Sequence, residues 1–216
     1  MNDWFCGTYL HDYRSELTDA TIQHLGITAA SVVLGLAIAL PLALVARRYH
    51  WLESTILGLA TGLYTIPSLA LFPLLVPFTG LSATTVVIGL ALYSLTILVR
   101  NTLEGLRAVP DDVRESAAGL GYGPTRMLLK VELPLALPVI MAGLRIATVS
   151  SVALTTVGAL VAYGGLGNMI LDGVNSNFKA EIMTASILCV ILAFLLDAVL
   201  VIVQRLTTPW TRAVSR

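Results

Sequence analysis

Charged residues are scarce in this 216-residue chain: only 12% are charged, whereas 56% are hydrophobic and the mean hydropathy is +0.85. This composition excludes an ordinary soluble globule. Thirteen basic and thirteen acidic residues cancel to a formal net charge of zero, so the totals show none of the basic excess that is typical of nucleic-acid-binding proteins. We therefore expect a protein that lies in a lipid bilayer and has no nucleic-acid partner.

Residues and motifs of many enzymes are also missing. The two cysteines, Cys6 and Cys189, lie far apart in the sequence, which excludes a disulfide framework and a metal-ligand spacing. His24 is the sole histidine within a long apolar segment, and no metal site is expected around it. The chain has no G-x-x-x-x-G-K-[ST] phosphate-binding loop, so we expect another chain to bind and hydrolyse ATP-Mg and expect no cofactor in this one.

What the chain does have is five long apolar segments. A helix needs about 20 residues to cross about 30 Å of hydrocarbon. Apolar segments of suitable length occur at about residues 22–46, 54–76, 81–99, 135–161 and 182–204. Lipid offers no hydrogen-bond partner to the backbone, and these segments lack the alternating pattern of barrel strands, so the sequence predicts an all-α integral membrane helical bundle.

The basic residues predict how this bundle is oriented. With an external N-terminus and a cytoplasmic C-terminus, only Arg14 and Lys179 lie outside, and most other basic residues lie inside. We expect an extracytoplasmic tail at residues 1–18, a transmembrane domain at 19–205 and a cytoplasmic tail at 206–216. The first apolar segment is too long for a signal peptide and is expected to stay in the mature chain.

The longest predicted cytoplasmic loop, residues 100–132, has the pattern of two short helices. Val109-Pro110-Asp111-Asp112 is a helix start, because proline suits the first turn and carboxylates suit the positive helix end. Glycines then permit a turn, and Pro124 begins a second helix. The small residues at the centre of this loop allow the surface of another protein to approach closely.

This loop also carries a family motif. Glu115-Ser116-Ala117, Gly121 four residues later, and Leu133-Pro134 farther on resemble the EAA loop of bacterial ABC importer permeases, with Ser116 in place of the usual alanine. Segments at residues 65–71, 131–145 and 164–167 are similar to permeases for glycine betaine, carnitine, choline and related osmoprotectants. The resemblance covers roughly residues 19–205.

The resemblance implies the fold of a type I ABC importer permease in the bacterial plasma (inner) membrane. It further implies a separate cytosolic ATPase subunit, an extracytoplasmic solute-binding protein, and a second permease, either another copy or a paralogue. It assigns contact with the ATPase to the loop; the residues concerned are Glu115, Ser116, Ala117, Gly119, Gly121, Leu133 and Pro134. We expect Glu115 to brace the loop by pairing with Arg126 or near Arg114.

Other candidate residues lie within the spans. Proline breaks one backbone hydrogen bond, so the second span should kink near Pro67, beside Tyr64 and Ser68. These residues, with Tyr93 in the third span, are candidates for the translocation path. Arg145 and Asp197 are candidates for an intramembrane ion pair, because a charge in the bilayer needs a partner or water. Gly58 and Gly62 have the spacing of a close helix contact.

The residues leave several alternatives open. Within transport, a methionine or other amino-acid permease has the same overall plan. An intramembrane hydrolase would need a serine and a histidine facing each other in the bundle, and no G-x-S-x-G lies in any predicted span. A self-sufficient channel would not need a docking loop.

Overall fold

The computed structural model describes residue 4 and residues 7–212, and over this part of the chain it contains helices and no β-strand. The predicted all-α class is confirmed. Cys6 and residues 213–216 of the predicted C-terminal tail lie outside the described residues. In chain order the elements are α1 (Gly7–Asp12), α2 (Arg14–Arg48), α3 (His50–Thr65), α4 (Ser68–Thr79), α5 (Ala83–Arg107), α6 (Asp111–Gly119), α7 (Pro124–Met127), the π-helical turn η1 (Leu128–Glu132), α8 (Leu133–Thr155), the 3₁₀ turn η2 (Thr156–Val161), α9 (Leu166–Asn175), α10 (Lys179–Thr207) and the 3₁₀ turn η3 (Pro209–Arg212).

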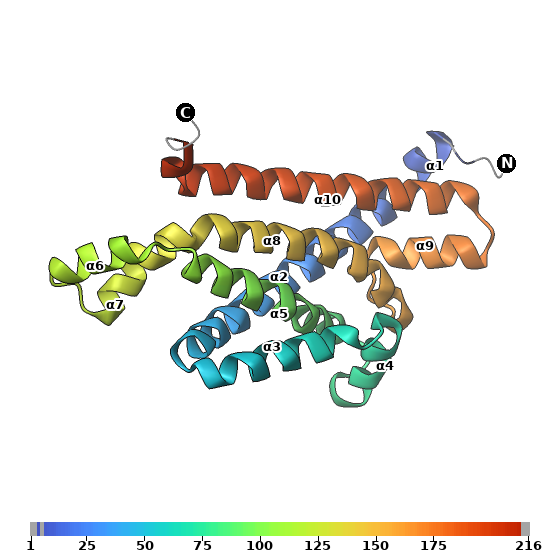
Figure 1. The fold of residues 1–216 in the computed structure, drawn as a ribbon. Helices are drawn as coiled ribbons and strands as arrows, with labels where there is room; N and C mark the ends of the chain where they lie inside the picture. Colours follow the sequence, from blue (N-terminus) through green and yellow to red (C-terminus); the bar gives the residue numbers. More distant parts are fainter. Residues whose placement is uncertain (1–3, 5–6, 213–216) are drawn as a thin grey trace.

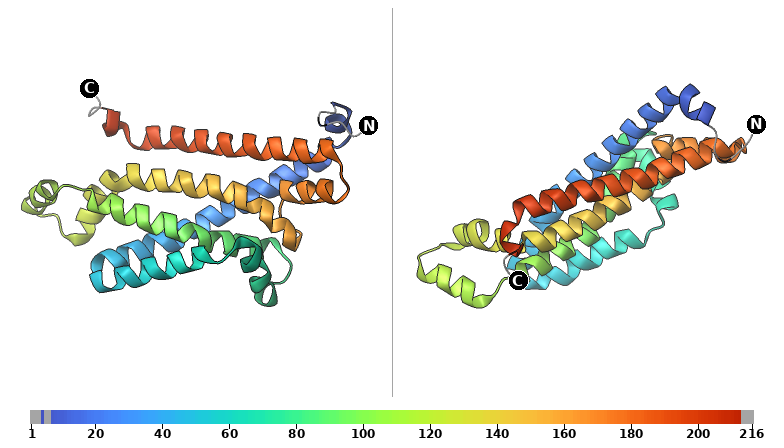
Figure 2. Two further views of the ribbon diagram at one scale, coloured as in Figure 1. Left: turned by 45° about the vertical axis from the view of Figure 1, so that its right-hand side comes forward. Right: turned by 90° about the horizontal axis from the view of Figure 1, so that it is seen from above.

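The long helices form an elongated bundle. Helices α10, α8, α5 and α3 lie side by side, and α2 crosses them obliquely (Figure 1). The two further views show the same arrangement (Figure 2). Helices α6 and α7 protrude at one end of the bundle, whereas α4 and α9 lie at the other end.

Helix α5 is the centre of the core because it packs against α2, α8 and α3. Small residues let its neighbours approach closely. A Cβ atom added at Gly105 of α5 would lie 2.9 Å from the carbonyl oxygen of Ala136 in α8, and one added at Gly143 would lie 2.5 Å from the Cβ of Asn101. On the other side of α5, Ala39 and Ala43 of α2 are completely buried in an apolar cluster of the core. Larger side chains at these positions would force the helices apart.

The second predicted span, residues 54–76, bends near Pro67 as predicted, but more sharply than a kinked helix. Helices α3 and α4 meet there at an angle of 100°. Pro67 has no N–H to continue the helix, and the residue before a proline is driven to extended backbone, which Ile66 adopts with φ −66° and ψ 125°. Four helices of the described chain are therefore long and apolar enough to cross a membrane, or five if the bent pair forms one span.

The helix bounds can be compared with the other predicted segments. The predicted limit of the N-terminal tail, residue 18, falls inside α2, which begins at Arg14. Within the predicted loop 100–132, α5 continues to Arg107, and the second helix begins at Pro124, as predicted, before α7 runs through η1 into α8 without a break. Helix α9 fills the connection between the last two spans, where no helix was predicted.

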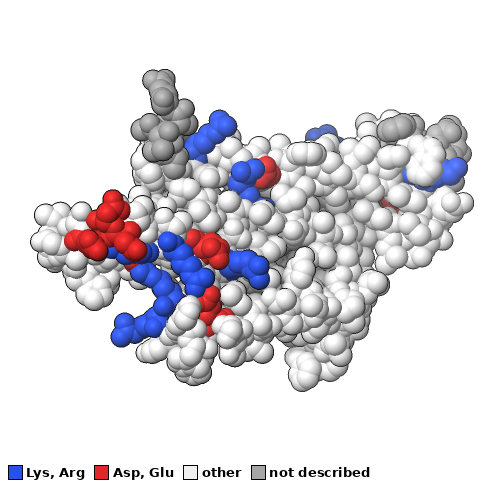
Figure 3. Space-filling model, viewed as in Figure 1, with Lys and Arg blue, Asp and Glu red and all other residues white. Residues whose placement is uncertain are grey.

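Helix α10 is the least covered of the long helices. Of its residues, only Ala180, Ala185 and Leu192 are buried. In water this exposed apolar surface would promote aggregation, whereas lipid or another membrane subunit can cover it. Most of the charge visible on the bundle gathers at the end that carries α6, and the middle is almost free of charge (Figure 3).

Candidate functional site

The protruding end is built around α6. This helix begins after Pro110 with Asp111 and Asp112 in its first turn, as the sequence predicts. It ends in a tight turn in which the amide of Gly121 donates to the carbonyl of Ala118 at 2.9 Å. Gly121 has φ +81°, a conformation that other residues adopt only with strain. The turn therefore depends on this glycine.

The exposed surface of α6 combines small residues with the carboxylates of Asp111, Asp112 and Glu115 and ends in one apolar tip. Glu115, Ser116 and Gly119 are exposed, and Leu120 at the tip is 78% exposed. Ala117 is instead buried, on the side of α6 that faces the rest of the chain. Leu133 and Pro134, from the same predicted motif, are half-buried in the first turn of α8 and do not share the exposed surface of α6.

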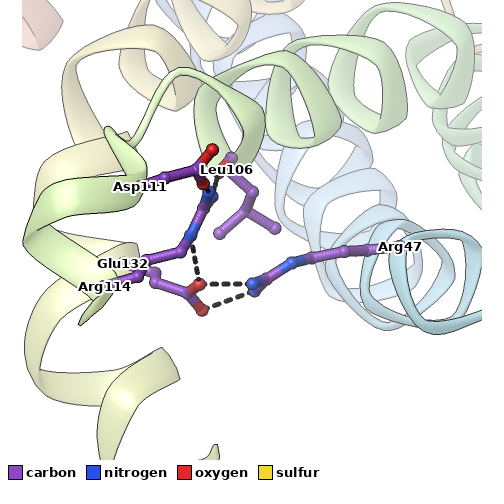
Figure 4. A network of polar contacts seen from close by, with 5 residues as sticks. All are labelled: Arg47, Leu106, Asp111, Arg114 and Glu132. Atoms are coloured by element: carbon purple, nitrogen blue, oxygen red, sulfur yellow. Dashed lines mark hydrogen bonds and ion pairs between the residues drawn. The ribbon is translucent and has the colours of Figure 1, made fainter. Parts of the chain in front are cut away.

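A network of charges attaches α6 to the bundle (Figure 4). Glu132, only 3% exposed, accepts hydrogen bonds from both terminal nitrogens of Arg47, one of them at 2.6 Å. It also accepts a hydrogen bond of 3.0 Å from Nε of Arg114. Arg114 further donates to Asp111 at 2.6 Å and to the carbonyl of Leu106 at 2.7 Å. The network thus joins α2, α5 and α6 to η1, the turn that leads into α8.

The same contacts fix the charge of Arg114. Burial alone would lower the pKa of its guanidinium, but the hydrogen bonds and negative charges of Asp111 and Glu132 raise this pKa above its ordinary value. The buried carboxylate is satisfied by two cations. Such a cluster is costly to break, because the charge that remains has lost its partner in a poorly hydrated place.

This network differs from the predicted brace. Glu115 is exposed, Arg114 pairs with Asp111 and Glu132, and Arg126 lies 4.2 Å from the centre of the Tyr122 ring. Arg114 therefore braces α6 in the structure, a role that was expected of Glu115. The sequence signal for this site was a carboxylate, Glu132, next to an apolar Leu-Pro segment, and it does not reveal the partners on α2 and α6.

A second region is the break between α3 and α4. It brings the four predicted path residues together, because the hydroxyl of Tyr93 donates to the carbonyl of Ile66 directly before Pro67. The rings of Tyr64 and Tyr93 meet edge to face with their centres 5.8 Å apart. Ser68 begins α4 just after the break. Tyr93 thus satisfies a carbonyl that the broken helix leaves without its usual partner.

A third region joins α8 to α10. Nε and Nη2 of Arg145 donate to the two carboxylate oxygens of Asp197 at 2.8 and 2.9 Å, a two-pronged ion pair. About a third of each side chain remains exposed, 35% for Arg145 and 31% for Asp197. This pair borders an open cavity.

Other predicted features have simpler surroundings. A Cβ atom added at Gly58 or Gly62 meets nothing within 4 Å, so this pair mediates no close contact within the described chain. His24 is fully buried, and its Nε2 lies 3.0 Å from the carbonyl oxygen of Val152. Cys189 is half-buried and free. Among the described residues, no three His, Cys, Asp or Glu side chains converge to hold a metal ion.

Comparison with known proteins gives one family. The family described as "Binding-protein-dependent transport system inner membrane component" matches residues 31–213. The osmoprotectant import permease protein OsmW of Salmonella typhimurium is 36% identical over 93% of this chain and 96% of its own length. The glycine betaine/carnitine/choline transport system permease protein OpuCB of Bacillus subtilis is 33% identical over 94% of this chain and 93% of its own length.

Solved structures show the same fold. The inward-facing MetNI methionine ABC transporter matches 91% of this chain and 98% of the compared chain, with a TM-score of 0.80 and 22% identity. At that identity the match speaks for the helical arrangement and not for the solute.

Proposed function

The chain belongs to the family of inner-membrane components of binding-protein-dependent transport systems and is a permease subunit of an ABC importer, and from this premise we propose that it carries an osmoprotectant-type solute such as glycine betaine, carnitine or choline. The observation that carries this proposal is the identity to osmoprotectant permeases along nearly the whole chain. A methionine or other amino-acid solute is less supported, because the resemblance to the methionine transporter is one of fold.

Binding-protein-dependent transport implies a solute-binding protein and an ATPase as partners. The ATPase chain would hold ATP-Mg. A pair of permeases in each transporter, with the N-terminus outside and the C-terminus inside, completes the proposed assembly. In support of this orientation, the end with α6 is the one at which charge gathers, and basic residues favour the cytoplasmic side.

In this orientation α6 is the surface that the ATPase contacts. Its exposed small residues permit close approach, and Leu120 offers an apolar contact at the tip. Closure of the ATPases would move α6. The Arg114–Glu132–Arg47 network would then carry this displacement into α2, α5 and, through η1, into α8, because it bonds α2, α5 and η1 to α6.

The test is uptake by the complete transporter in proteoliposomes. The permease is reconstituted with its ATPase and its binding protein, and labelled glycine betaine, choline and methionine are compared. We expect ATP-dependent, uphill uptake of glycine betaine or choline and none of methionine. Uptake of methionine alone would contradict the proposed solute, and uphill uptake without the ATPase would contradict the proposed assembly.

Glu115 provides a separate test of docking. Because this side chain is exposed on α6 and takes no part in the network that joins Arg114 to Glu132, Glu115→Ala should leave the fold intact but weaken the coupling of ATP hydrolysis to uptake. The ratio of ATP hydrolysed to solute imported measures this coupling. An unchanged ratio would remove Glu115 from the proposed contact.

A further inference from the structure

A cavity of about 680 Å³ lies between α8 and α10, a volume within the range of small-molecule sites. Its polar lining comes from the Arg145–Asp197 ion pair and Ser150, and Phe194 forms part of its apolar wall. On α10, Phe194 and Asp197 are three positions apart and so lie on the same face of the helix.

The cavity opens away from α2. A separate groove of about 240 Å³ lies where α2, α8 and α10 meet, and α8 contributes Leu144 and Thr148 to it. Arg145 and Val149 are each the next residue along α8 but line the larger cavity. The two hollows therefore use different faces of α8, and the charged one lies on the face not covered by α2.

The ion pair lies well inside the apolar part of the bundle. At 1.5 Å per residue, Arg145 is about 18 Å along α8 from Leu133, and Asp197 is about 12 Å before Arg205 on α10. Charges at such depth are costly and usually face protein or a water-filled space. A pair that served only to pack α8 against α10 would be shielded from the cavity, whereas this one leaves about a third of each side chain exposed at 35% and 31%.

The exposed groups have complementary chemistry for one kind of ligand. Arg145 uses Nε and Nη2 for Asp197, so its Nη1 hydrogens are not engaged in that pair. They suit a carboxylate. Asp197 suits a cation, and Phe194, 73% exposed, presents an aromatic ring one helical turn away. A small solute with a quaternary ammonium and a carboxylate would meet a matching group at each end.

We propose that the α8/α10 cavity is a solute site inside the permease, where Asp197 and Phe194 contact the quaternary ammonium and Arg145 contacts the carboxylate. This inference rests on the proposed function, since it takes the solute to be an osmoprotectant. The rival is an ion pair that only anchors α10 to α8, with the cavity filled by lipid or by a second permease.

The experiment measures import of two solutes that differ in the carboxylate. Complete transporters in proteoliposomes are given labelled glycine betaine, which has a carboxylate, or choline, which lacks one. Arg145→Gln should lower glycine betaine uptake about tenfold and choline uptake much less, because only the former loses a charged hydrogen bond. Phe194→Leu should lower uptake of both about threefold, the size of a lost cation–π contact.

Two further variants separate a binding role from an anchoring role. Val199→Ala is the matched control, because Val199 lies on α10 but lines the other groove, and its uptake should be unchanged. In the charge reversal Arg145→Asp with Asp197→Arg, an anchor would be restored, whereas the solute would meet the wrong charge at each end. We expect the reversed protein to regain the thermal stability lost by Arg145→Gln, but not glycine betaine uptake.

The possible results have distinct meanings. Equal loss of both solutes in Arg145→Gln, full uptake by the reversed protein, or normal uptake by Phe194→Leu would each overturn the site. Phe194→Leu keeps the test decisive even where charge changes impair folding, because this variant leaves the ion pair intact. If the unmodified transporter imports neither of these solutes nor carnitine, the proposed function itself fails, whereas normal import with an unaltered solute preference in the variants overturns only the site.

Discussion

The two arginine–carboxylate clusters of this permease differ in how completely they are enclosed. Glu132 is 3% exposed and is held by two arginines, and the cluster around it joins α6 to α2, α5 and η1. The Arg145–Asp197 pair joins two helices and leaves about a third of each side chain, 35% and 31%, open to a cavity. An enclosed network has its bonding capacity used and suits the transfer of movement, whereas a partly open pair retains capacity for a ligand.

The largest effect is expected where the enclosed cluster is broken. Arg47→Met with Arg114→Met leaves Glu132 buried without either cation, which should cost about 3–5 kcal/mol of stability. Thermal unfolding of the purified transporter measures the loss. The control is Arg48→Met, because Arg48 is exposed and adjacent to Arg47 but takes no part in the network. If both proteins unfold at the same temperature, the network does not hold α6.

The turn after α6 should be the next most sensitive place at this end. Gly121→Ala forces an alanine into φ +81°, which should cost about 1–2 kcal/mol and misplace the tip of the loop. Gly123→Ala is the matched control, since a Cβ there meets nothing within 4 Å and Gly123 has φ −71°, which alanine adopts without strain. The expected result is weaker coupling of ATP hydrolysis to uptake in the first variant only. Equal coupling in both would show that the turn geometry is unimportant.

At the membrane-embedded break, a smaller effect is expected. Tyr93→Phe removes the hydroxyl that donates to the carbonyl of Ile66, at a cost of about 1 kcal/mol. The ring contact with Tyr64 should remain. A thermal shift smaller than that of Gly121→Ala, with altered uptake, would be consistent with a role in the path. A shift as large as that of the Arg47 and Arg114 double variant would show instead that the break is as enclosed as the α6 network.

The smallest effect on stability is expected at the open pair. Asp197→Asn should cost about 1 kcal/mol or less, because about a third of the Arg145 side chain is open to the cavity and the amide oxygen that replaces the carboxylate can still accept a hydrogen bond from it. Thermal unfolding beside the Arg47 and Arg114 double variant provides the comparison. A loss as great as in the enclosed cluster would mean that the two ion pairs are energetically alike and would remove the distinction drawn between them.

Sequence reasoning went furthest where one local rule decided the outcome. Apolar length identified the regions of the long helices, Pro110 with two aspartates located the start of α6, and glycines located its turn. The 100° break was predicted only as a kink, because its angle depends on how α4 packs against α5 and η2.

The partners of the charged residues were harder to predict. Arg47 and Glu132 are 85 positions apart, and nothing in their neighbouring residues indicates that α2 ends beside the start of α8. Arg145 and Asp197 were predicted as a pair because both are charges in apolar segments, whereas their bonded geometry follows from the packing of α8 against α10. Helix α9 was missed because its ten residues are too few for a span and follow a glycine-rich turn.

Helix α6 is the proposed cytoplasmic contact surface for a separate ATPase. The most direct test uses Ser116→Cys, exposed on α6, in a chain whose Cys6 and Cys189 are replaced by serine. A membrane-impermeant thiol reagent is applied to right-side-out and inside-out vesicles, with and without the ATPase subunit. We predict labelling only in inside-out vesicles and strong protection by the ATPase. Labelling from the outside, or equal labelling with and without the ATPase, would contradict the account.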